Sequence, residues 1–399
     1  MKQTLSKLLE GAYFVTVFLI LAIIVSLPFR RPASDLEHGP LIQNTTTNAF
    51  SVVWRQEGNE AGVLSLRGNG INGSRFAATQ DGARYEARAE GLTSGTAYRY
   101  EILHTTSDGT EYRLFDGQAA TVKPAGAPFT FTVFADSGTG QRHQFRLAQV
   151  MNRYPTDFIL HAGDLVYKKG KARDYRRKFF SPYRELISHI PFYPVLGNHD
   201  VATDNGQPFL DIFSPPKNGP PSIQPGRCYT FDYGDARFVG IDSTLDSETL
   251  ATAVAPWLQE TLADSSITWR FVYFHHPPWA GGKRPGNAKI RDTLVPAIEA
   301  AGVDIVFCGH NHLYERTHPI TGGEIAPSNG VIYIISGAGG KTLHDERTSD
   351  APYLNVSNDA EYSFTWVTIN GPRLELMQIS EDDAVLDTFI LVKDAETKP

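Results

Sequence analysis

The stretch VDIVFCGHNHLYER (Val303–Arg316) decides the class of fold. It opens with an apolar run, VDIVFC, which is typical of a strand buried on both faces of a sheet. Two histidines, His310 and His312, follow directly behind a glycine. A loop with two polar residues would explain this order, and so would a metal site at the end of a buried strand.

Four other apolar runs in the same region also end in short polar motifs. The runs FTFTVFA, DFILHA, FYPVL and WRFVYF are followed by Asp136-Ser-Gly138, Gly163-Asp164-Leu-Val-Tyr167, Gly197-Asn198-His199-Asp200 and His275-His276, respectively. Helical patterns such as RHQFRLAQVMNRY alternate with these runs, which predicts an α/β domain. In open α/β sheets, ligands bind at the carboxyl ends of the strands. We therefore expect the five motifs to gather around one point.

The residue types in these motifs indicate a site for metal ions. They offer carboxylates, imidazoles, one amide oxygen and one phenol, without a thiolate cluster, and this set suits hard or borderline cations. Seven protein donors exceed the need of one ion in an open site. A carboxylate that bridges two ions, as in the hydrolytic centres of phosphatases, accounts for the number. The sequence therefore predicts a dinuclear centre.

The motifs D-x-G, G-D-x-x-Y, G-N-H-D, V-x-x-H and G-H-x-H-x-Y-E-R, in this order, resemble those of the metallophosphoesterases. The tyrosine narrows the resemblance to the purple acid phosphatases, over about residues 40–393. The resemblance implies an α/β domain built as a βαβαβ four-layer sandwich. It also implies hydrolysis of phosphate monoesters of the acid phosphatase type, in which a metal-bound hydroxide attacks phosphorus in line with the leaving oxygen.

The resemblance further implies a role for each motif residue. Fe(III) would be held by Asp136, Asp164, Tyr167 and His312. A divalent Zn, Mn or Fe(II) would be held by the bridging Asp164 together with Asn198, His275 and His310. His199 would act in catalysis and contact the phosphate, which Asn198 would also contact.

One family feature is missing from this chain. Plant and animal members carry a further histidine about ten residues beyond the V-x-x-H ligand, whereas here the stretch runs His276-Pro-Pro-Trp-Ala-Gly-Gly-Lys283-Arg284. His276 is a candidate proton donor. Lys283 and Arg284 are candidate phosphate contacts, because their charges suit an oxyanion. The alternative for both is a solvated glycine-rich loop.

The chain before this domain predicts an all-β sandwich over residues 40–123. Short, partly alternating segments recur there between Gly, Asn, Asp and Ser,. GLTSGTAYRYEI resembles a fibronectin type III domain, in which Leu92, Gly95 and Tyr98 match the tyrosine-corner segment and Trp54 fits the early core tryptophan. We expect packing roles for these residues and a catalytic domain at 124–393, followed by a tail at 394–399.

The N-terminus predicts a membrane segment at 1–31 and a polar linker at 32–39. Gly11–Phe29 contains no charge and is long enough to span a bilayer, which takes about 20 helical residues,. A cleaved signal peptide and an uncleaved anchor are both open, and we favour an anchor. The position of this run near residue 1 predicts an extracytoplasmic protein, which is periplasmic, secreted or on the cell surface, tethered by its N-terminal helix.

Composition narrows the classes of partner. The 399 residues suggest more than one domain, and a net charge of −7 argues against nucleic acid as a partner,. Cys308 lies in an apolar run, which predicts a buried free thiol. We expect a phosphate ester as substrate, and the oligomeric state stays open. Two other functions are a phosphodiesterase or nucleotide-cleaving metallophosphoesterase, and a catalytically inert surface-binding protein.

Overall fold

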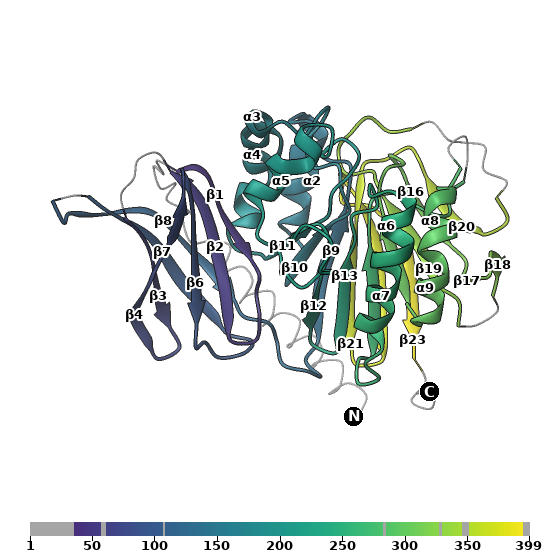
Figure 1. Ribbon diagram of the computed structural model, residues 1–399, viewed down its shortest axis with the longest axis horizontal. Coiled ribbons are helices and arrows are strands. Elements are labelled where there is room, and N and C mark those ends of the chain that lie inside the picture. Colours follow the sequence, from purple (N-terminus) through teal and green to yellow (C-terminus); the bar gives the residue numbers. More distant parts are fainter. Residues whose placement is uncertain are drawn as a thin grey trace, which may run out of the picture. The chain divides into compact units, whose positions relative to one another are not determined.

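A computed structural model describes residues 36–56, 61–106, 108–281, 285–326, 329–344 and 351–393 (Figure 1). The apolar run Gly11–Phe29, the pair Lys283 and Arg284, and the predicted tail at 394–399 lie outside these residues. Among the residues that are described, no helix is both long and apolar enough to cross a membrane.

The first part of the described chain is β-rich and forms two antiparallel sheets. One sheet has the order β1-β2-β6-β5 and the other the order β4-β3-β7-β8. The strands are β1 (Leu36–Gln43), β2 (Ala49–Gln56), β3 (Ala61–Gly68), β4 (Ile71–Ala77), β5 (Thr79–Asp81), β6 (Arg84–Glu90), β7 (Ala97–Thr105) and β8 (Glu111–Ala120). Aromatic side chains fill the core between them, with Trp54 stacked on Tyr85. The Thr93 N–H donates to the Tyr98 hydroxyl at 2.9 Å, which is the contact expected of a tyrosine corner,.

Strand β1 begins inside the segment 32–39 that we assigned to a linker. Leu36 pairs with Gln56 of β2, and the pairing continues to Gln43 with two register shifts. Those irregularities, and Gly39 and Pro40 within the strand, interrupt the alternation of side chains that marks a strand in a sequence,.

The second part contains two larger sheets. One has the order β11-β10-β9-β21-β22-β23 and the other the order β12-β13-β14-β15-β19-β16-β20. The strands of the first are β9 (Phe129–Phe134), β10 (Phe158–His161), β11 (Phe192–Pro194), β21 (Ser363–Asn370), β22 (Arg373–Ser380) and β23 (Val385–Val392). Those of the second are β12 (Tyr229–Tyr233), β13 (Ala236–Gly240), β14 (Trp269–Tyr273), β15 (Ile305–Cys308), β16 (Tyr314–Thr317), β19 (Ile332–Ser336) and β20 (Leu354–Asn358). A small hairpin joins β17 (Ile320–Thr321) to β18 (Glu324–Ile325).

The helices lie on the outer faces of these two sheets (Figure 1). The helices beside the first sheet are α2 (Arg142–Met151), α3 (Ala172–Tyr175), α4 (Ser181–Ile187) and α5 (Gln207–Ile212). Those beside the second are α6 (Ser247–Thr249), α7 (Ala255–Leu262), α8 (Ala288–Thr293) and α9 (Val295–Ala300). Short π-helical turns at Arg176–Phe180 and Leu250–Val254 and a 3₁₀ turn at Asp204–Gly206 connect some of them.

An aromatic core holds the two sheets together face to face. Phe131 of the first sheet makes edge contacts with Phe238, Phe271 and Phe307 of the second, at ring-centroid distances of 5.3–6.0 Å. The order of layers is therefore helix, sheet, sheet, helix. Because the central strands are covered on both faces, their sequences are largely apolar, although Thr130 and Thr132 alternate with phenylalanines in β9,.

The direction of the central strands brings their carboxyl ends together. Strands β9, β10 and β11 are parallel, and so are β13, β14, β15 and β19. The polar motifs that follow them therefore share one edge of the two-sheet stack. Cys308, the last residue of β15, is buried with a free thiol, as the sequence predicts.

Candidate metal centre

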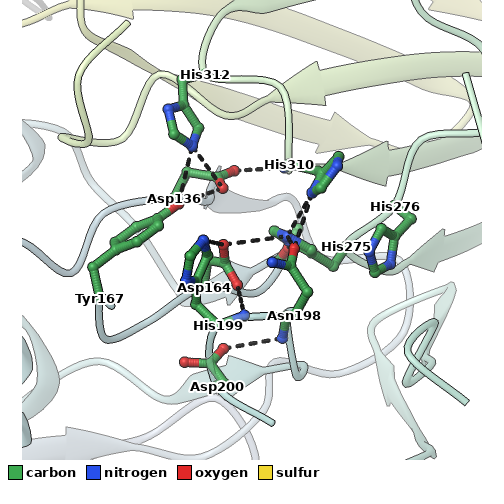
Figure 2. Close-up of polar contacts among 12 residues, drawn as sticks. Asp136, Asp164, Tyr167, Asn198, His199, Asp200, His275, His276, His310 and His312 are labelled. Carbon is green, nitrogen blue, oxygen red and sulfur yellow. Dashed lines mark hydrogen bonds and ion pairs between the residues drawn. The ribbon is translucent and has the colours of Figure 1, made fainter. Parts of the chain in front are cut away.

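The polar residues that follow the strands converge at this edge (Figure 2). Asp136 follows β9, Asp164 follows β10, Asn198 follows β11, His275 follows β14 and His310 follows β15. Figure 2 shows their side chains pointing toward a common centre, together with Tyr167 and His312. All seven sequence-predicted ligands thus lie in one place, and their role as ligands stays a prediction.

The backbone at the centre is unusual, because three of these residues have positive φ angles. The values are 56° for Asp136, 58° for Asp164 and 72° for His310. Such angles are uncommon for residues with a side chain and cluster at functional sites. Two glycines make room for the turns: a Cβ on Gly197 would lie 2.2 Å from Asp164 Oδ1, and one on Gly309 would lie 2.6 Å from Asp136 Oδ2.

The first group of donor atoms surrounds the Tyr167 hydroxyl. This hydroxyl lies 2.8 Å from Asp136 Oδ1 and 3.1 Å from His312 Nε2. The His312 ring is oriented by the carbonyl of Thr342, 2.8 Å from its Nδ1. Because Nδ1 donates to that carbonyl, the lone pair of Nε2 faces Tyr167 and Asp136.

The second group of donor atoms surrounds the side-chain oxygen of Asn198. Its Oδ1 lies 3.1 Å from His275 Nε2 and 3.0 Å from His310 Nδ1, and these two nitrogens are 3.3 Å apart. His275 Nδ1 donates to the carbonyl of Ala162 at 2.9 Å, so its Nε2 lone pair points inward,. Ligand bonds of about 2.0–2.1 Å at tetrahedral angles place donor atoms roughly 3.3–3.4 Å apart. The spacing therefore fits one shared cation.

Asp164 lies between the two groups (Figure 2). Its Oδ2 is 3.4 Å from His275 Nε2, and its Oδ1 accepts the His199 N–H at 2.9 Å. Donor atoms of Asp136, Asp164 and His275 all lie within 4.8 Å of one another. This position suits a carboxylate shared by two metal ions, and the donors as a set fit a potential dinuclear site.

The charges at the centre are not balanced by lysine or arginine. Asp136, Asp164 and Asp200 are all buried, and within the described ranges the ion pairs of Asp136 and Asp164 are with histidines. Burial raises the pKa of Asp136 to about 8. Burial and the charge of Asp164 raise the pKa of Asp200 to about 7.

Burial is the largest single influence on the pKa of Asp164 and of His275, but their charged neighbours together outweigh it. Burial acts to raise the pKa of Asp164, whereas His275 and His199 together bring it below the usual value. Burial acts to lower the pKa of His275, but Asp164 and Asp136 raise it to about 10. Protons thus compensate this carboxylate-rich centre in the metal-free protein, and cations can replace them.

Asp200 has a structural part in this arrangement. Its carboxylate accepts the N–H groups of Leu165, Val166 and Gly197 at 3.0–3.2 Å. The first two belong to the loop that carries Asp164 and Tyr167, and the third belongs to the loop that carries Asn198. One buried carboxylate thus fixes the register of two ligand loops.

His199 has one ring nitrogen available for a substrate. Its Nδ1 lies 2.6 Å from the carbonyl of Lys168, to which it donates. Its Nε2 is 3.9 Å from Asp164 Oδ2, and its ring lies 4.6 Å from that of Tyr167. The ring is partly exposed beside both donor groups, which is where a phosphate contact is expected.

His276 lies beside the second donor group with a defined tautomer. The Ser243 hydroxyl oxygen accepts the His276 N–H at 3.1 Å and lies 2.9 Å from His276 Nδ1. Because the hydroxyl donates its proton to Nδ1, the ring carries its own proton on Nε2. His276 lies 4.7 Å from the His310 ring, and its nitrogens also come within metal-binding reach of His275 and His310.

The sequence analysis missed one segment of the site, Gly337–His344. It follows β19, and His344 stacks on the His312 ring at 3.9 Å and accepts the His312 N–H on Nδ1 at 3.0 Å. The signal was present, because the run GVIYIIS ends in Gly-Ala-Gly-Gly like the other strand ends. Because β19 is parallel to β15, its carboxyl end lies at the same edge as theirs.

A separate cavity of about 450 Å³ contains none of the predicted metal ligands. Asn205, Gln224 and Arg227 line one side of it, and Leu245 and Thr249 line another. The Arg227 guanidinium is fixed by Asp242 at 2.5 Å. The charged group in the wall of this cavity, the Arg227 guanidinium, therefore already has hydrogen-bond partners within the protein.

Residues 129–314 match the family of calcineurin-like phosphoesterases. This range begins at β9 and includes all seven residues of the two donor groups. The chain contains a calcineurin-like metallophosphoesterase domain.

The curated relatives of this chain include proteins named purple acid phosphatases. Probable inactive purple acid phosphatase 1 of Arabidopsis thaliana is 26% identical over 408 residues, which cover 86% of this chain and 64% of that protein. A nucleotide pyrophosphatase/phosphodiesterase of Hordeum vulgare is 26% identical over 293 residues, covering 62% of this chain and 75% of that protein. This chain spans about three fifths of the length of the first relatives it matches.

A solved structure shares the fold. Purple acid phosphatase PPD1 from yellow lupin (Lupinus luteus) seeds superimposes with a TM-score of 0.78 at 18% sequence identity, covering 89% of this chain and 74% of that one. The coverage extends over both parts of the metallophosphoesterase chain, and the β-rich N-terminal part is consistent with a fibronectin type III-like domain.

Proposed function

We propose that this protein hydrolyses phosphate monoesters at a dinuclear metal centre, in the manner of an acid phosphatase. One observation carries the proposal: seven oxygen and nitrogen donors converge in two groups without a lysine or arginine counter-ion in the described chain. Buried carboxylates require compensation, and divalent or trivalent cations supply it.

We assign Fe(III) to the group of Asp136, Tyr167 and His312, and Zn, Mn or Fe(II) to the group of Asn198, His275 and His310, with Asp164 shared. The phenol and the carboxylate are hard oxygen donors, which favour the more highly charged ion. When bound, the two ions supply Lewis-acid charge for the phosphoryl group and lower the pKa of water so that hydroxide is available as nucleophile.

The side chains around the ions bind and orient the substrate. His199 Nε2 is positioned to donate to a phosphoryl oxygen, because Nδ1 is held by the Lys168 carbonyl,. His276 holds a proton on Nε2, because Ser243 fixes the opposite nitrogen. Burial lowers the pKa of His276 to about 2, so the ring is neutral, and its Nε2–H would stabilise the leaving oxygen by a hydrogen bond without transferring its proton,.

Metal analysis and a visible spectrum test the proposal together. We expect iron and one divalent metal per chain, a visible absorption band from the Tyr167 phenolate to Fe(III), and hydrolysis of 4-nitrophenyl phosphate that Asp164→Ala abolishes. Absence of iron would refute the ferric assignment alone. Protein that is fully loaded with two metals and still hydrolyses no phosphate ester would refute the enzymatic function and favour the inert surface-binding alternative.

A second candidate function is phosphodiester or nucleotide cleavage by the same residues. It is favoured by the barley relative, which is named a nucleotide pyrophosphatase/phosphodiesterase. Rates with 4-nitrophenyl phosphate and bis(4-nitrophenyl) phosphate distinguish the two functions. A higher kcat/KM for the diester would favour the second candidate.

We also propose that the protein is extracytoplasmic and tethered through Gly11–Phe29, since this run carries no charge and is long enough to span a bilayer as a helix,. Fractionation of expressing cells should recover the full chain with membranes after an alkaline wash. Protease added to intact cells or spheroplasts should digest the catalytic domain. Recovery of the chain in the cytoplasmic fraction would contradict this localisation.

A further inference from the structure

The segment Gly337–His344, which no sequence motif of the family identified, is fixed against two of the three loops that carry the first donor group. The Gly337 N–H donates to the carbonyl of Leu313 at 3.0 Å, and the Gly339 N–H donates to that of Ala135 at 3.1 Å. The Lys341 N–H donates to the Asp136 carbonyl at 2.9 Å. The segment therefore holds a defined register beside the centre.

Close packing makes this register hard to change. A Cβ on Gly337 would lie 2.0 Å from the carbonyl oxygen of Asn311, and one on Gly339 would lie 2.1 Å from that of Ala135. Only glycine fits at these two places, because the obstructing atoms are backbone. The backbone of Lys341 is thus held in place by its hydrogen bond to Asp136, a predicted metal ligand.

The side chain of Lys341 lies over the ring of Tyr167. Its ammonium nitrogen lies 5.4 Å from the centroid of the Tyr167 ring. The His199 ring contacts the same tyrosine, at a centroid distance of 4.6 Å. A cation and the predicted phosphate-binding histidine therefore border one aromatic ring at the centre.

The ammonium of Lys341 has no acidic partner within the described part of the chain. Two other lysines near the centre already have partners for their ammonium groups. Lys178 pairs with Asp174 at 3.0 Å, and Lys289 donates to the carbonyls of Ser243 and Leu245. Lys341 is partly exposed, so its charge is accessible to a ligand that enters from solvent.

We propose that Lys341 binds a phosphoryl oxygen of the substrate. This assignment rests on the proposed function and names a further substrate-binding residue for it. The ammonium is a mobile point charge on a flexible stem, which suits a phosphate that must enter and leave. It supplies the cationic contact that the sequence suggested for Lys283 and Arg284.

The alternative role for Lys341 is structural, as a cation that only packs on the Tyr167 ring. In that case its removal would loosen the tyrosine and alter the metal site, without a direct effect on phosphate. The two roles differ in which measurement changes, so they can be separated.

The test compares three variants of the full chain, each loaded with metal and assayed for metal content. Lys341→Met removes the charge at similar length, and Lys341→Arg keeps the charge. Lys217→Met is the matched control, because Lys217 is an exposed lysine outside the donor groups. The readouts are the Kd for inorganic phosphate by calorimetry, kcat and KM for 4-nitrophenyl phosphate, and the dependence of the phosphate Kd on ionic strength.

We expect Lys341→Met to weaken phosphate binding about 10-fold or more, as is usual for the loss of one charge-assisted hydrogen bond. KM should rise by a similar factor, with normal metal content and a flatter dependence on salt. Lys341→Arg should recover most of the affinity, and Lys217→Met should match the wild type.

Two outcomes would overturn the proposal. In the first, Lys341→Met binds phosphate and substrate as the wild type does. In the second, it loses metal, which assigns Lys341 to the support of Tyr167. Failure of the proposed function appears differently, as metal-loaded wild-type protein without turnover. The calorimetric comparison of phosphate binding is unaffected by that failure.

Discussion

Aspartates occur at both ends of the central strands, but their partners differ between the two ends. At the amino ends, Asp157 precedes β10 and Asp304 precedes β15, and each carboxylate has a lysine and a backbone N–H as partners. Asp157 accepts from Lys123 and Thr130 at 2.8 Å each. Asp304 accepts from Lys393 and from the Arg270 N–H, also at 2.8 Å.

At the carboxyl ends, Asp136 and Asp164 have no such lysine among the described residues. Their partners are imidazoles, a phenol and backbone N–H groups, which together leave the carboxylates short of positive charge. Asp242, which follows β13, is an exception, since it pairs with Arg227, and it is not a predicted ligand. We interpret a carboxylate that is paired with a lysine as a structural residue. A buried carboxylate without such a partner is a candidate ligand for a metal ion.

The largest effect should come from exchanging one carboxylate for an amide at each end. Asp164→Asn removes the shared ligand, so we expect loss of bound metal and a fall in kcat of at least about 10³-fold, as for other groups that stabilise transition-state charge. Asp304→Asn should keep metal and activity. Metal analysis and 4-nitrophenyl phosphate turnover measure both. A metal-depleted Asp304→Asn protein would break the comparison.

A second test concerns His276, a residue at the carboxyl ends of the strands. His276→Ala should lower kcat by about 10²–10³-fold, the usual cost of removing one hydrogen-bond donor that stabilises developing negative charge. The loss should be larger with phenyl phosphate than with 4-nitrophenyl phosphate, because nitrophenolate needs less stabilisation as it leaves.

Ser243→Ala is the matched control for His276, since it removes the hydroxyl that fixes the ring. It should cause a smaller loss with the same dependence on leaving group. An equal loss for both esters would instead assign His276 to metal binding, which its distance to His275 and His310 permits.

Metal removal should destabilise the fold through the carboxyl ends alone. A ligand present at a thousand times its Kd stabilises the native state by about 4 kcal/mol. Chelation should therefore lower the thermal midpoint of the wild type, as followed by differential scanning fluorimetry. Asp164→Asn should be far less sensitive to chelator, because it retains little metal that a chelator could remove. Equal sensitivity of the two proteins would contradict this account.

The smallest effect is expected from removing a lysine at the amino ends. Lys393→Met leaves the buried Asp304 without its cation, which should cost about 1–3 kcal/mol of unfolding free energy at neutral pH. Catalysis and metal content should be unchanged. Urea unfolding followed by fluorescence measures the loss.

The sign of its pH dependence follows from the pKa of Asp304. Burial raises this pKa, and Lys393 acts against the rise. Without Lys393 the folded-state pKa moves further above the unfolded one, so the folded state holds more protons and stability falls as pH rises through that interval. The difference between variant and wild type should be small near pH 4 and largest near pH 7. A constant difference would contradict it.

Much of the fold and of the candidate site was predictable from local patterns. Apolar runs without alternation identified the buried parallel strands, and the polar motif behind each run identified a donor. The segment Gly337–His344 was missed because nothing local distinguishes a parallel from an antiparallel strand. Strand β1 was missed because Gly39 and Pro40 interrupt its pattern.

The sequence by itself determined which residue types stand at the carboxyl ends of the strands. A strand that is buried on both faces gives an apolar run, and the sequence shows where that run ends. Tertiary structure alone decided which donors share a group, which nitrogen of His275 and His312 faces inward, and which carboxylates lack a cation. Those properties depend on carbonyls such as Ala162 and Thr342 and on strand neighbours far away in the chain. Whether a buried carboxylate has a cationic partner depends on which side chains lie near it in space, and spacing along the chain does not show this.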